Sequence, residues 1–544
     1  MRNILPLFIV FLFMFEEIHA SNIGGKVIDQ NSSDPIDRAE IIIVEKEISF
    51  RDTVYSDVEG NWDFEVITGI EENFLPDDFL VRQNYPNPFN PSTNIEFQIP
   101  HSGNVDILIH NILGELLDYQ SQSVSAGSYS VKWNGAASAG VYFYTIKFAN
   151  ASITKKMIQL DGGNGKGGLT QIKSGVGNFP KKRNFKSANP KRFEIIISKF
   201  AYVPDTLEVE VSGGEFFETT LETIHSRAFL FDLHNDVLEV MASDPGYNFG
   251  EWNDINHTDL PRMKAGGIDA QFFAGWVSPY QFPGNPNKRA LEMIGIFNQT
   301  MNGYPGLEQA FDYEDVLEIN ENGKIAGLLA IEGGHAIEND LNKLKEFYEL
   351  GVRYMTITWN NSVDWAVSAQ DDRSESVGLS EFGREVIRTM DSLGMIIDVS
   401  HTGIKTIEDI LEVTNKPVIA THSGVRSLRD HYRNLYDDQI IKIANSGGVI
   451  GVVFYPPFLT DGRTASIGTV IKHINYIVDL AGIDHVAVGS DFDGIGTNTV
   501  SRLDEVSDFP VLTEALLKSG YSRKDVEKIL GGNVLRVLKQ AAGN

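Results

Sequence analysis

The sequence contains no cysteine. This absence excludes a disulfide framework, a cysteine nucleophile and cysteine-ligated zinc, so only His, Asp or Glu side chains could hold a metal ion. Basic residues are also scarce, with 46 Lys and Arg against 74 Asp and Glu and a formal net charge of −28. An acidic protein repels phosphate backbones, and we therefore expect no nucleic-acid partner.

Long apolar runs are absent beyond the first twenty residues. Arg2, the apolar run from Ile4 to Phe15 and the small residue Ala20 are typical of a signal peptide over residues 1–20. A membrane anchor is the alternative, but a transmembrane helix needs about 20 apolar residues. We expect no transmembrane segment after signal removal and an exported protein, in the periplasm, at the cell surface or in the medium.

The chain of 544 residues changes its pattern near residue 225. Before that point, short alternating strands are broken by Gly, Asn, Pro and Ser, which is typical of all-β sandwiches. After it, apolar strands alternate with amphipathic helices. We predict a multidomain protein, with N-terminal β-sandwiches followed by a C-terminal barrel over residues 226–544.

Eight apolar runs of strand length recur in the C-terminal part. They are Ala228–Leu233, Ile268–Trp276, Ile325–Ile331, Tyr354–Trp359, Met395–Val399, Pro417–Thr421, Gly448–Tyr455 and His485–Gly489. Eight such runs with helical segments between them predict a (β/α)8 barrel of the TIM type, whose active site lies at the C-terminal ends of its strands.

Polar side chains that can bind metal follow five of these runs. They are His234 and Asp236 after the first run, Glu332 after the third, His401 after the fifth, His422 after the sixth, and Asp491 and Asp493 after the eighth. Because the C-terminal ends of all barrel strands meet on one rim, we expect these side chains to lie close together.

Imidazole and carboxylate groups are suitable ligands for zinc. His234 and Asp236 occupy alternate positions of one extended segment and point the same way. We expect one Zn²⁺ ion on His234, Asp236 and Glu332, and a second on Glu332, His401 and His422, with Glu332 bridging the two. Such a pair could share a hydroxide that is nucleophilic at neutral pH.

Asp491 is the candidate general acid and base, because a carboxylate there could carry a proton to a leaving nitrogen. Asp493 faces the other side and is expected to cap the following turn. Each residue also has a structural interpretation: His401 as a buried, hydrogen-bonded histidine, and Glu332 as a residue favoured at a helix start. His335 is open to either reading, and His257 is expected to be structural.

The segments DLHND, IEGGH, DVSH, THS, GSDFDG and GGNVLRV occur in this order between Ala228 and Leu538. In this combination the chain resembles the renal (membrane) dipeptidases, a family of amidohydrolase-like metallopeptidases. The resemblance implies a binuclear zinc site on the five ligands above, hydrolysis of dipeptides, and Asp491 as the acid/base. It also implies that Arg433, directly before Asn434, binds the substrate carboxylate, as a guanidinium does well. Animal members are dimers, so a homodimer is a candidate assembly.

One position departs from this family. Many relatives have a histidine after the fourth strand that helps to hold the scissile carbonyl, whereas here the segment TITWNNSVDWA places Trp359 there. An indole can pack or donate one hydrogen bond, but it is not a charged partner for an oxyanion. We therefore expect Trp359 to contact substrate and to alter substrate range or mechanism.

The N-terminal part resembles two other families. Residues 21–70 and 191–224 resemble a split carboxypeptidase-regulatory-like sandwich. Between them, residues 73–160 resemble the sorting domain of the type IX secretion pathway of bacteria, through NYPNPFNPSTNIEF, ILGE and GVYFYTIK. The secretion machinery is therefore a candidate partner, although an internal sorting domain could equally be a plain structural sandwich. Residues 161–190, rich in Gly, Lys and Asn, are expected to be a flexible linker.

Two further functions stay open at this point. Another binuclear metal amidohydrolase, such as a lactam or lactone hydrolase, would fit the barrel, although no lysine follows the fourth run to bridge the metals. A non-catalytic surface-binding protein would fit the N-terminal sandwiches, but it would predict damage to the ligand set, and none is visible.

Overall fold

The computed structural model describes residues 21–45, 50–66, 79–136, 138–149, 151–160, 168–174, 191–211, 215–462 and 464–541. The signal peptide expected over 1–20, and most of the linker expected over 161–190, lie outside the described residues. The chain divides into two compact units, which we describe separately. The first is β-rich, and the second contains the residues from 220 onward with the short segments Asp29–Ser33 and Ser198–Pro204.

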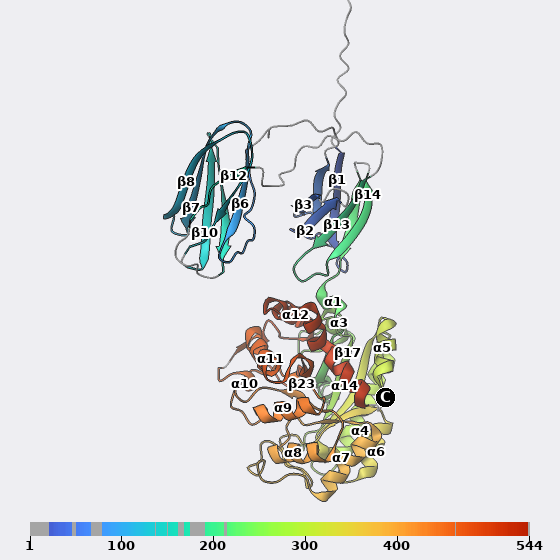
Figure 1. Cartoon of the computed structure of the whole chain (residues 1–544). Helices are drawn as coiled ribbons and strands as arrows, with labels where there is room; N and C mark the ends of the chain where they lie inside the picture. Colours follow the sequence, from blue (N-terminus) through green and yellow to red (C-terminus); the bar gives the residue numbers. More distant parts are fainter. Residues whose placement is uncertain are drawn as a thin grey trace, which may run out of the picture. The chain divides into compact units, whose positions relative to one another are not determined.

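Two sheets in the first unit combine strands from distant parts of the sequence (Figure 1). One has the order β15-β1-β4 and the other β14-β13-β2-β3. Their strands are β1 (Ser21–Asp29), β2 (Glu40–Glu45), β3 (Phe50–Tyr55), β4 (Asn61–Val66), β13 (Lys191–Ser198), β14 (Asp205–Val211) and β15 (Phe216–Leu221). Burial alternates along β2, as in a sandwich with one face toward a core.

The residues between β4 and β13 form two further sheets, with orders β11-β10-β7-β8 and β12-β9-β6-β5. Their strands are β5 (Leu80–Val81), β6 (Thr93–Ile99), β7 (Gly103–Asn111), β8 (Leu116–Val124), β9 (Gly127–Trp133), β10 (Gly140–Phe148), β11 (Ala151–Gln159) and β12 (Lys173–Ser174). Strand β12 lies in the segment expected as a linker, where it pairs with β9 while Ile172 is buried in the core of these sheets.

Eight parallel strands of the second unit form a closed barrel. The order is β17-β16-β25-β23-β22-β21-β20-β19, and pairing of β17 with β19 closes the ring. The strands are β16 (Phe231–Asn235), β17 (Ala270–Trp276), β19 (Ile325–Glu332), β20 (Val352–Thr356), β21 (Ile396–Asp398), β22 (Val418–Ser423), β23 (Ile450–Val452) and β25 (Val486–Val488). Each of the eight apolar runs contains or overlaps one of them, so the predicted barrel is confirmed.

Three short strands lie outside the ring: β18 (Leu307–Gln309) beside β19, and β24 (Ala465–Ser466) paired with β26 (Val500–Ser501). The ring strands are buried on both faces, and all residues of β16 and β19 are buried. This is why they appear in the sequence as continuous apolar runs, whereas β2 alternates.

Helices connect and cover the barrel strands (Figure 1). The α-helices are α1 (Ile224–Arg227), α2 (Val237–Ser243), α3 (Leu260–Ala265), α4 (Pro286–Gly303), α5 (Tyr313–Glu321), α6 (Leu341–Glu349), α7 (Glu381–Leu393), α8 (Ile404–Val413), α9 (Asp437–Asn445), α10 (Pro456–Leu459), α11 (Ile467–Ala481), α12 (Phe509–Lys518), α13 (Arg523–Glu527) and α14 (Asn533–Ala541). Shorter turns of helix are η1 (Gly334–Ile337), η2 (Ile483–His485), η3 (Val506–Asp508) and η4 (Lys528–Gly532).

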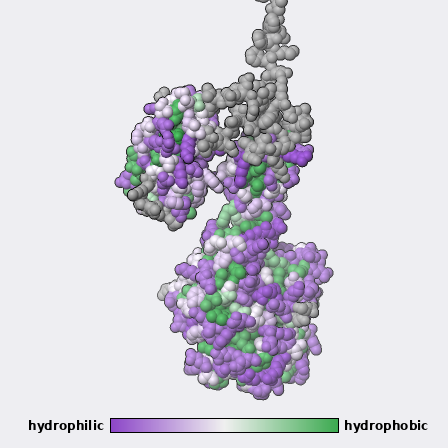
Figure 2. Space-filling model, viewed as in Figure 1, coloured by the Kyte–Doolittle hydropathy of each residue, from purple (hydrophilic) through white to green (hydrophobic). Residues whose placement is uncertain are grey.

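The surface of the barrel seen in Figure 2 is mainly hydrophilic, with hydrophobic residues in scattered small patches. Among the described residues, no helix combines the length and the apolar character that crossing a membrane requires.

Candidate metal centre

The structure brings six of the side chains expected at the barrel rim into one buried cluster. Their ligand atoms form three overlapping groups, each within 4.8 Å: His234 with Asp236 and Glu332, Glu332 with His401 and His422, and His234 with His422 and Asp491. All six come from the C-terminal ends of β16, β19, β21, β22 and β25 or from the residues that directly follow. Such groups could hold metal ions.

The two oxygens of Glu332 face different histidines. Oε1 lies 2.9 Å from His401 Nε2 and 3.6 Å from His422 Nε2, while Oε2 lies 3.8 Å from His234 Nε2. The Nε2 atoms of His401 and His422 are themselves 3.1 Å apart. A carboxylate whose oxygens belong to two donor sets suits two neighbouring cations.

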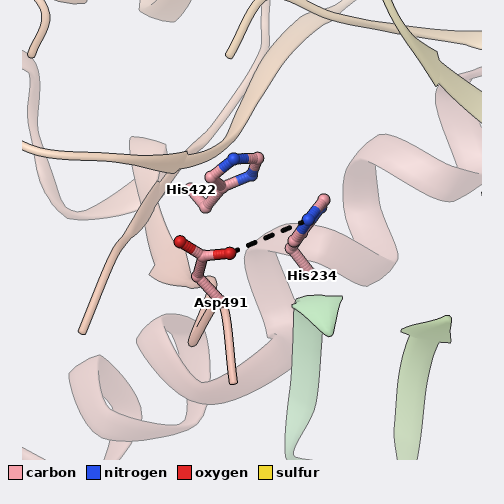
Figure 3. A group of neighbouring side chains, drawn as sticks. All are labelled: His234, His422 and Asp491. Carbon is pink, nitrogen blue, oxygen red and sulfur yellow. Dashed lines mark ion pairs between the residues drawn. The ribbon is translucent and has the colours of Figure 1, made fainter. Parts of the chain in front are cut away.

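On the other side of the cluster, His234 Nε2 lies 3.4 Å from Asp236 Oδ2 and 4.0 Å from Asp491 Oδ1. Figure 3 shows His234, His422 and Asp491 converging from three chain segments. Within the described part of the chain, His234 Nε2 and Asp236 Oδ1 are buried without any hydrogen-bond partner. Buried polar atoms are normally paired, so these two are suitably placed to bind a cation, and the residues fit a metal.

Each histidine of the cluster is oriented through its other ring nitrogen. His234 Nδ1 lies 2.6 Å from Tyr354 Oη, His401 Nδ1 lies 3.0 Å from Asn360 Oδ1, and His422 Nδ1 lies 2.8 Å from the hydroxyl of its neighbour Thr421. Such contacts fix the ring and the tautomer of a metal-binding histidine.

None of Tyr354, Asn360 and Thr421 was predicted from the sequence as an orienting residue. Asn360 follows the fourth strand, as the other site residues follow theirs, and that position was the only available signal. Tyr354 lies inside β20, where a tyrosine in an apolar run is indistinguishable from an ordinary core residue.

Burial sets the electrostatics of the site. Desolvation raises the pKa of Glu332 well above its usual range and that of Asp491 to about 8. Desolvation alone would lower the pKa of His234, but the carboxylates of Asp236, Glu332 and Asp491 raise it to about 10. Carboxylates crowded together away from water favour a bound cation.

The pKa values of His401 and His422 are lowered, whereas that of His234 is raised. Burial, with the charges of Arg433 and His234 nearby, holds the pKa of each well below the usual value for histidine. Both rings are therefore neutral at physiological pH. A neutral imidazole has a lone pair to offer, which is the form that binds metal.

The backbone at the rim is unusual. His401 and Asp491 have left-handed conformations, with φ of 65° and 60°. Gly494 is tightly enclosed, because a Cβ atom there would lie 2.2 Å from Asp236 Oδ2 and 2.6 Å from Asp491 Oδ1. Only glycine allows this close approach of the turn to the two carboxylates.

Arg433 lies beside the cluster and is only 3% exposed. Its Nη2 donates a hydrogen bond to the backbone carbonyl of His422 at 3.0 Å, and its guanidinium lies 5.2 Å from the Phe458 ring. Its Nε is buried without a partner among the residues that the structure describes. By contrast, Arg426 and Arg429 form ion pairs with exposed aspartates.

Trp359 lies on the His401 side of the cluster, with ring centroids 6.1 Å apart. It also contacts Trp276 at 5.1 Å and Tyr280 at 6.2 Å. Trp276 ends β17 and lies level with Glu332 in the neighbouring strand, and Tyr280 is 75% exposed. We call Trp276, Tyr280 and Trp359 the aromatic wall.

A cavity of about 300 Å³ opens beside His401 and Arg433. The loop segments 369–375 and 423–439 supply most of its lining, together with Val399, Thr402 and Ile404. Its size is at the lower end of the range for small-molecule sites.

The remaining candidates lie outside the three metal-competent groups. His335 contacts the carbonyl of Val277 through Nε2 at 2.9 Å. Asp493 does not cap the following turn as expected: its Oδ1 accepts a hydrogen bond from the backbone N–H of His257, on a different loop, at 2.8 Å.

Comparisons with known proteins agree on the barrel. Residues 218–544 match the sequence-family model described as "Membrane dipeptidase (Peptidase family M19)". Dipeptidase 3 of Mus musculus is 34% identical over 322 residues, which are 57% of this chain and 64% of that protein. Dipeptidase 3 of Rattus norvegicus is 33% identical with the same coverage. The chain thus matches less than two thirds of the length of these relatives.

Solved structures of metallo peptidases also superpose on this chain. The metallo peptidase "dipeptidase AC" superposes with a TM-score of 0.54 at 27% identity, covering 58% of this chain and 99% of that chain. A metallo peptidase from Rhodobacter sphaeroides, liganded with a phosphinate mimic of the dipeptide L-Ala-D-Ala, gives the same values.

The N-terminal part has a match of its own. Residues 83–159 match a secretion-system C-terminal sorting domain, which indicates an exported bacterial protein.

Proposed function

The chain belongs to the membrane dipeptidase family, peptidase family M19, and we propose that its barrel is a zinc-dependent enzyme that hydrolyses the peptide bond of dipeptides. The observation that carries this proposal is the convergence of three overlapping metal-competent groups, two of which share Glu332, with the buried Arg433 beside them. Relatives named as dipeptidases, and a metallo peptidase bound to a dipeptide mimic, agree with it.

The ligand set that we propose consists of five residues and two zinc ions. His234, Asp236 and Glu332 would hold one ion, and Glu332, His401 and His422 would hold the other. The division of the Glu332 oxygens between His401 and His234 supports a bridging role. The unpartnered atoms His234 Nε2 and Asp236 Oδ1 support the first set.

When bound, zinc at these residues would make water nucleophilic near neutral pH and would polarise the scissile carbonyl. Asp491 is the proposed general base and acid: its carboxylate accepts the proton of the nucleophile and delivers it to the leaving amine nitrogen. A carboxylate within reach of both the nucleophile and the leaving group can carry a proton between them. The left-handed turn holds this carboxylate 4.0 Å from His234.

Arg433 is proposed to bind the free carboxylate of the dipeptide. A buried guanidinium with an unpartnered Nε can make a charge-assisted hydrogen bond to a carboxylate oxygen. Since Arg433 bonds to His422, the substrate carboxylate would lie close to the metal ions. This geometry limits the substrate to a single residue beyond the scissile bond.

Trp359 is proposed to contact the amino-terminal residue of the substrate. Arg433 lies on the His422 side of the cluster and Trp359 on the His401 side. A dipeptide held at its carboxylate by Arg433 would therefore extend past His422 and His401 toward the aromatic wall. Aromatic rings favour apolar and aromatic side chains there.

The N-terminal part is proposed to be accessory. Its divisions are those given by the sequence: a split sandwich of residues 21–70 and 191–224, and a sorting-like insertion of residues 73–160. We propose that these modules act in export or surface attachment through the secretion machinery, with a final location in the periplasm, at the cell surface or in the medium. A homodimer is the assembly that we propose for the enzyme.

The test is hydrolysis of unblocked dipeptides ending in L- or D-alanine by the purified full chain, with N-acetylated and C-amidated dipeptides as controls. We expect cleavage of the unblocked dipeptides, weak cleavage of the amidated ones, and a loss of more than about 100-fold in kcat for Asp491→Asn, the scale of general acid–base catalysis. Two bound zinc ions without cleavage of any dipeptide would refute the substrate assignment but not the metal centre.

A further inference from the structure

The turn that carries Asp491 is held in a costly backbone conformation. Asp491 and Asp493 both have left-handed conformations, with φ of 60° and 69°. Residues other than glycine keep such conformations only where their surroundings impose them. The direction of the Asp491 carboxylate therefore depends on whatever holds this turn. Part of this support comes from the strand β16 segment, where the Asp491 N–H donates to the His234 carbonyl at 3.1 Å and the Asp236 N–H donates to the Phe492 carbonyl at 2.9 Å.

The support from another loop comes from His257, which lies before α3. The backbone N–H of Asp493 donates to His257 Nδ1 at 2.9 Å, and the backbone N–H of His257 donates to Asp493 Oδ1 at 2.8 Å. The imidazole also stacks on Phe492, with ring centroids 5.4 Å apart and an angle of 28°. Because a backbone N–H can only donate, Nδ1 is the unprotonated nitrogen of this ring.

The loop that presents His257 is itself firmly anchored. The backbone carbonyl of His257 accepts a hydrogen bond from Val506 at 3.1 Å. Arg262, only 1% exposed, lies 2.6 Å from Asp259 and 2.8 Å from Glu505. The loop therefore forms a rigid support for the turn, and no metal-ligating residue is part of it.

We propose that His257 is a positioning residue for the reaction, acting through Asp493 to fix the turn that orients the carboxylate of Asp491. It touches neither substrate nor metal. This role of His257 rests on the proposed function, in which Asp491 carries the proton from the nucleophile to the leaving nitrogen. Misplacement of a reacting group by 1 Å can cost about 100-fold in rate, so loss of the Nδ1 acceptor should lower kcat by roughly that factor.

Two substitutions separate the contacts of His257. His257→Phe keeps the ring on Phe492 but removes the acceptor for the Asp493 N–H. His257→Asn removes the ring but places an acceptor oxygen at the position of Nδ1. His485→Phe is the matched control, because His485 Nδ1 also binds backbone, the Gly448 carbonyl at 2.8 Å, but at the opposite end of the barrel strands. If His257→Phe does not fold, His257→Ala replaces it.

For zinc-loaded full-length protein, we expect His257→Phe to lower kcat about 100-fold, with KM and bound zinc nearly unchanged. We expect His257→Asn to recover most of kcat, and His485→Phe to lower only the thermal midpoint. A loss of stability in His257→Phe with kcat preserved, or an equal kcat loss in His257→Asn, would overturn the proposal.

Crystal structures of the same zinc-loaded variants give a readout that does not depend on activity. The Asp491 carboxylate should move by about 1 Å or more in His257→Phe, the scale at which rates respond, and stay in place in His257→Asn. An unmoved Asp491 carboxylate in His257→Phe would refute the positioning role of His257. This readout holds even if the parent protein cleaves no dipeptide. Absence of cleavage by the parent protein would count against the proposed function alone.

Discussion

The hydroxyl of Tyr354 should control zinc affinity. Tyr354 is fully buried, burial keeps its pKa well above the usual range, and its Oη lies 2.6 Å from His234 Nδ1. When His234 binds metal through Nε2, Nδ1 carries the proton and its N–H donates a hydrogen bond to this oxygen. Tyr354→Phe removes the acceptor and changes little else in volume.

Two independent magnitudes agree for this substitution. Loss of such a partner costs about 10–100-fold in metal affinity, which corresponds to about 1.4–2.7 kcal/mol. A buried N–H left without an acceptor costs about 1–3 kcal/mol. We therefore expect the dissociation constant of one zinc ion to rise by about 10–100-fold, while the second ion is less affected.

The assay is competition for zinc with a chromophoric chelator, followed for each equivalent of metal. Tyr144→Phe is the control, because Tyr144 is also fully buried and donates its hydroxyl proton to the Arg82 carbonyl at 2.5 Å in the other unit. Equal zinc affinity of Tyr354→Phe and the unchanged protein, or an equal loss in Tyr144→Phe, would refute the reasoning.

Three further substitutions test other parts of the site. Gly494→Ala should lower bound zinc and reduce kcat at least 100-fold, about the cost of a 1 Å displacement. The reason is that the new Cβ would lie 2.2 Å from Asp236 Oδ2 and displace that carboxylate. A variant with full zinc content and unchanged kcat would contradict this. Arg433→Met should raise KM about 30-fold or more, as loss of a buried charge partner does; equal KM for free and C-amidated dipeptides in the parent would argue against carboxylate binding. Trp359→Ala should reduce the preference for an aromatic over an alanyl amino-terminal residue by about tenfold, the worth of an aromatic pair; an unchanged ratio of kcat/KM values would exclude this role.

The barrel and its metal-competent residues were predictable because two simple rules combine. Parallel strands buried on both faces give continuous apolar runs, and their C-terminal ends share one rim. His234, Glu332 and His422 could thus be placed together although about 190 residues separate the first from the last.

The contacts that orient this cluster were not predictable in the same way. Tyr354 meets His234 across the barrel interior, and His257 meets Asp493 from a loop more than 200 residues away. Neither pairing follows from the spacing of residues along the chain. The expectation that Asp493 caps the turn after it was wrong, because the local sequence does not reveal its partner His257 on another loop.

The most direct test of a binuclear zinc dipeptidase is a zinc titration of metal-stripped full-length protein, with bound metal and dipeptide hydrolysis followed together. We predict that two equivalents bind, that hydrolysis appears as the second site fills, and that Glu332→Gln weakens both equivalents. Hydrolysis that is complete after one equivalent, or that persists in the stripped protein, would contradict the account.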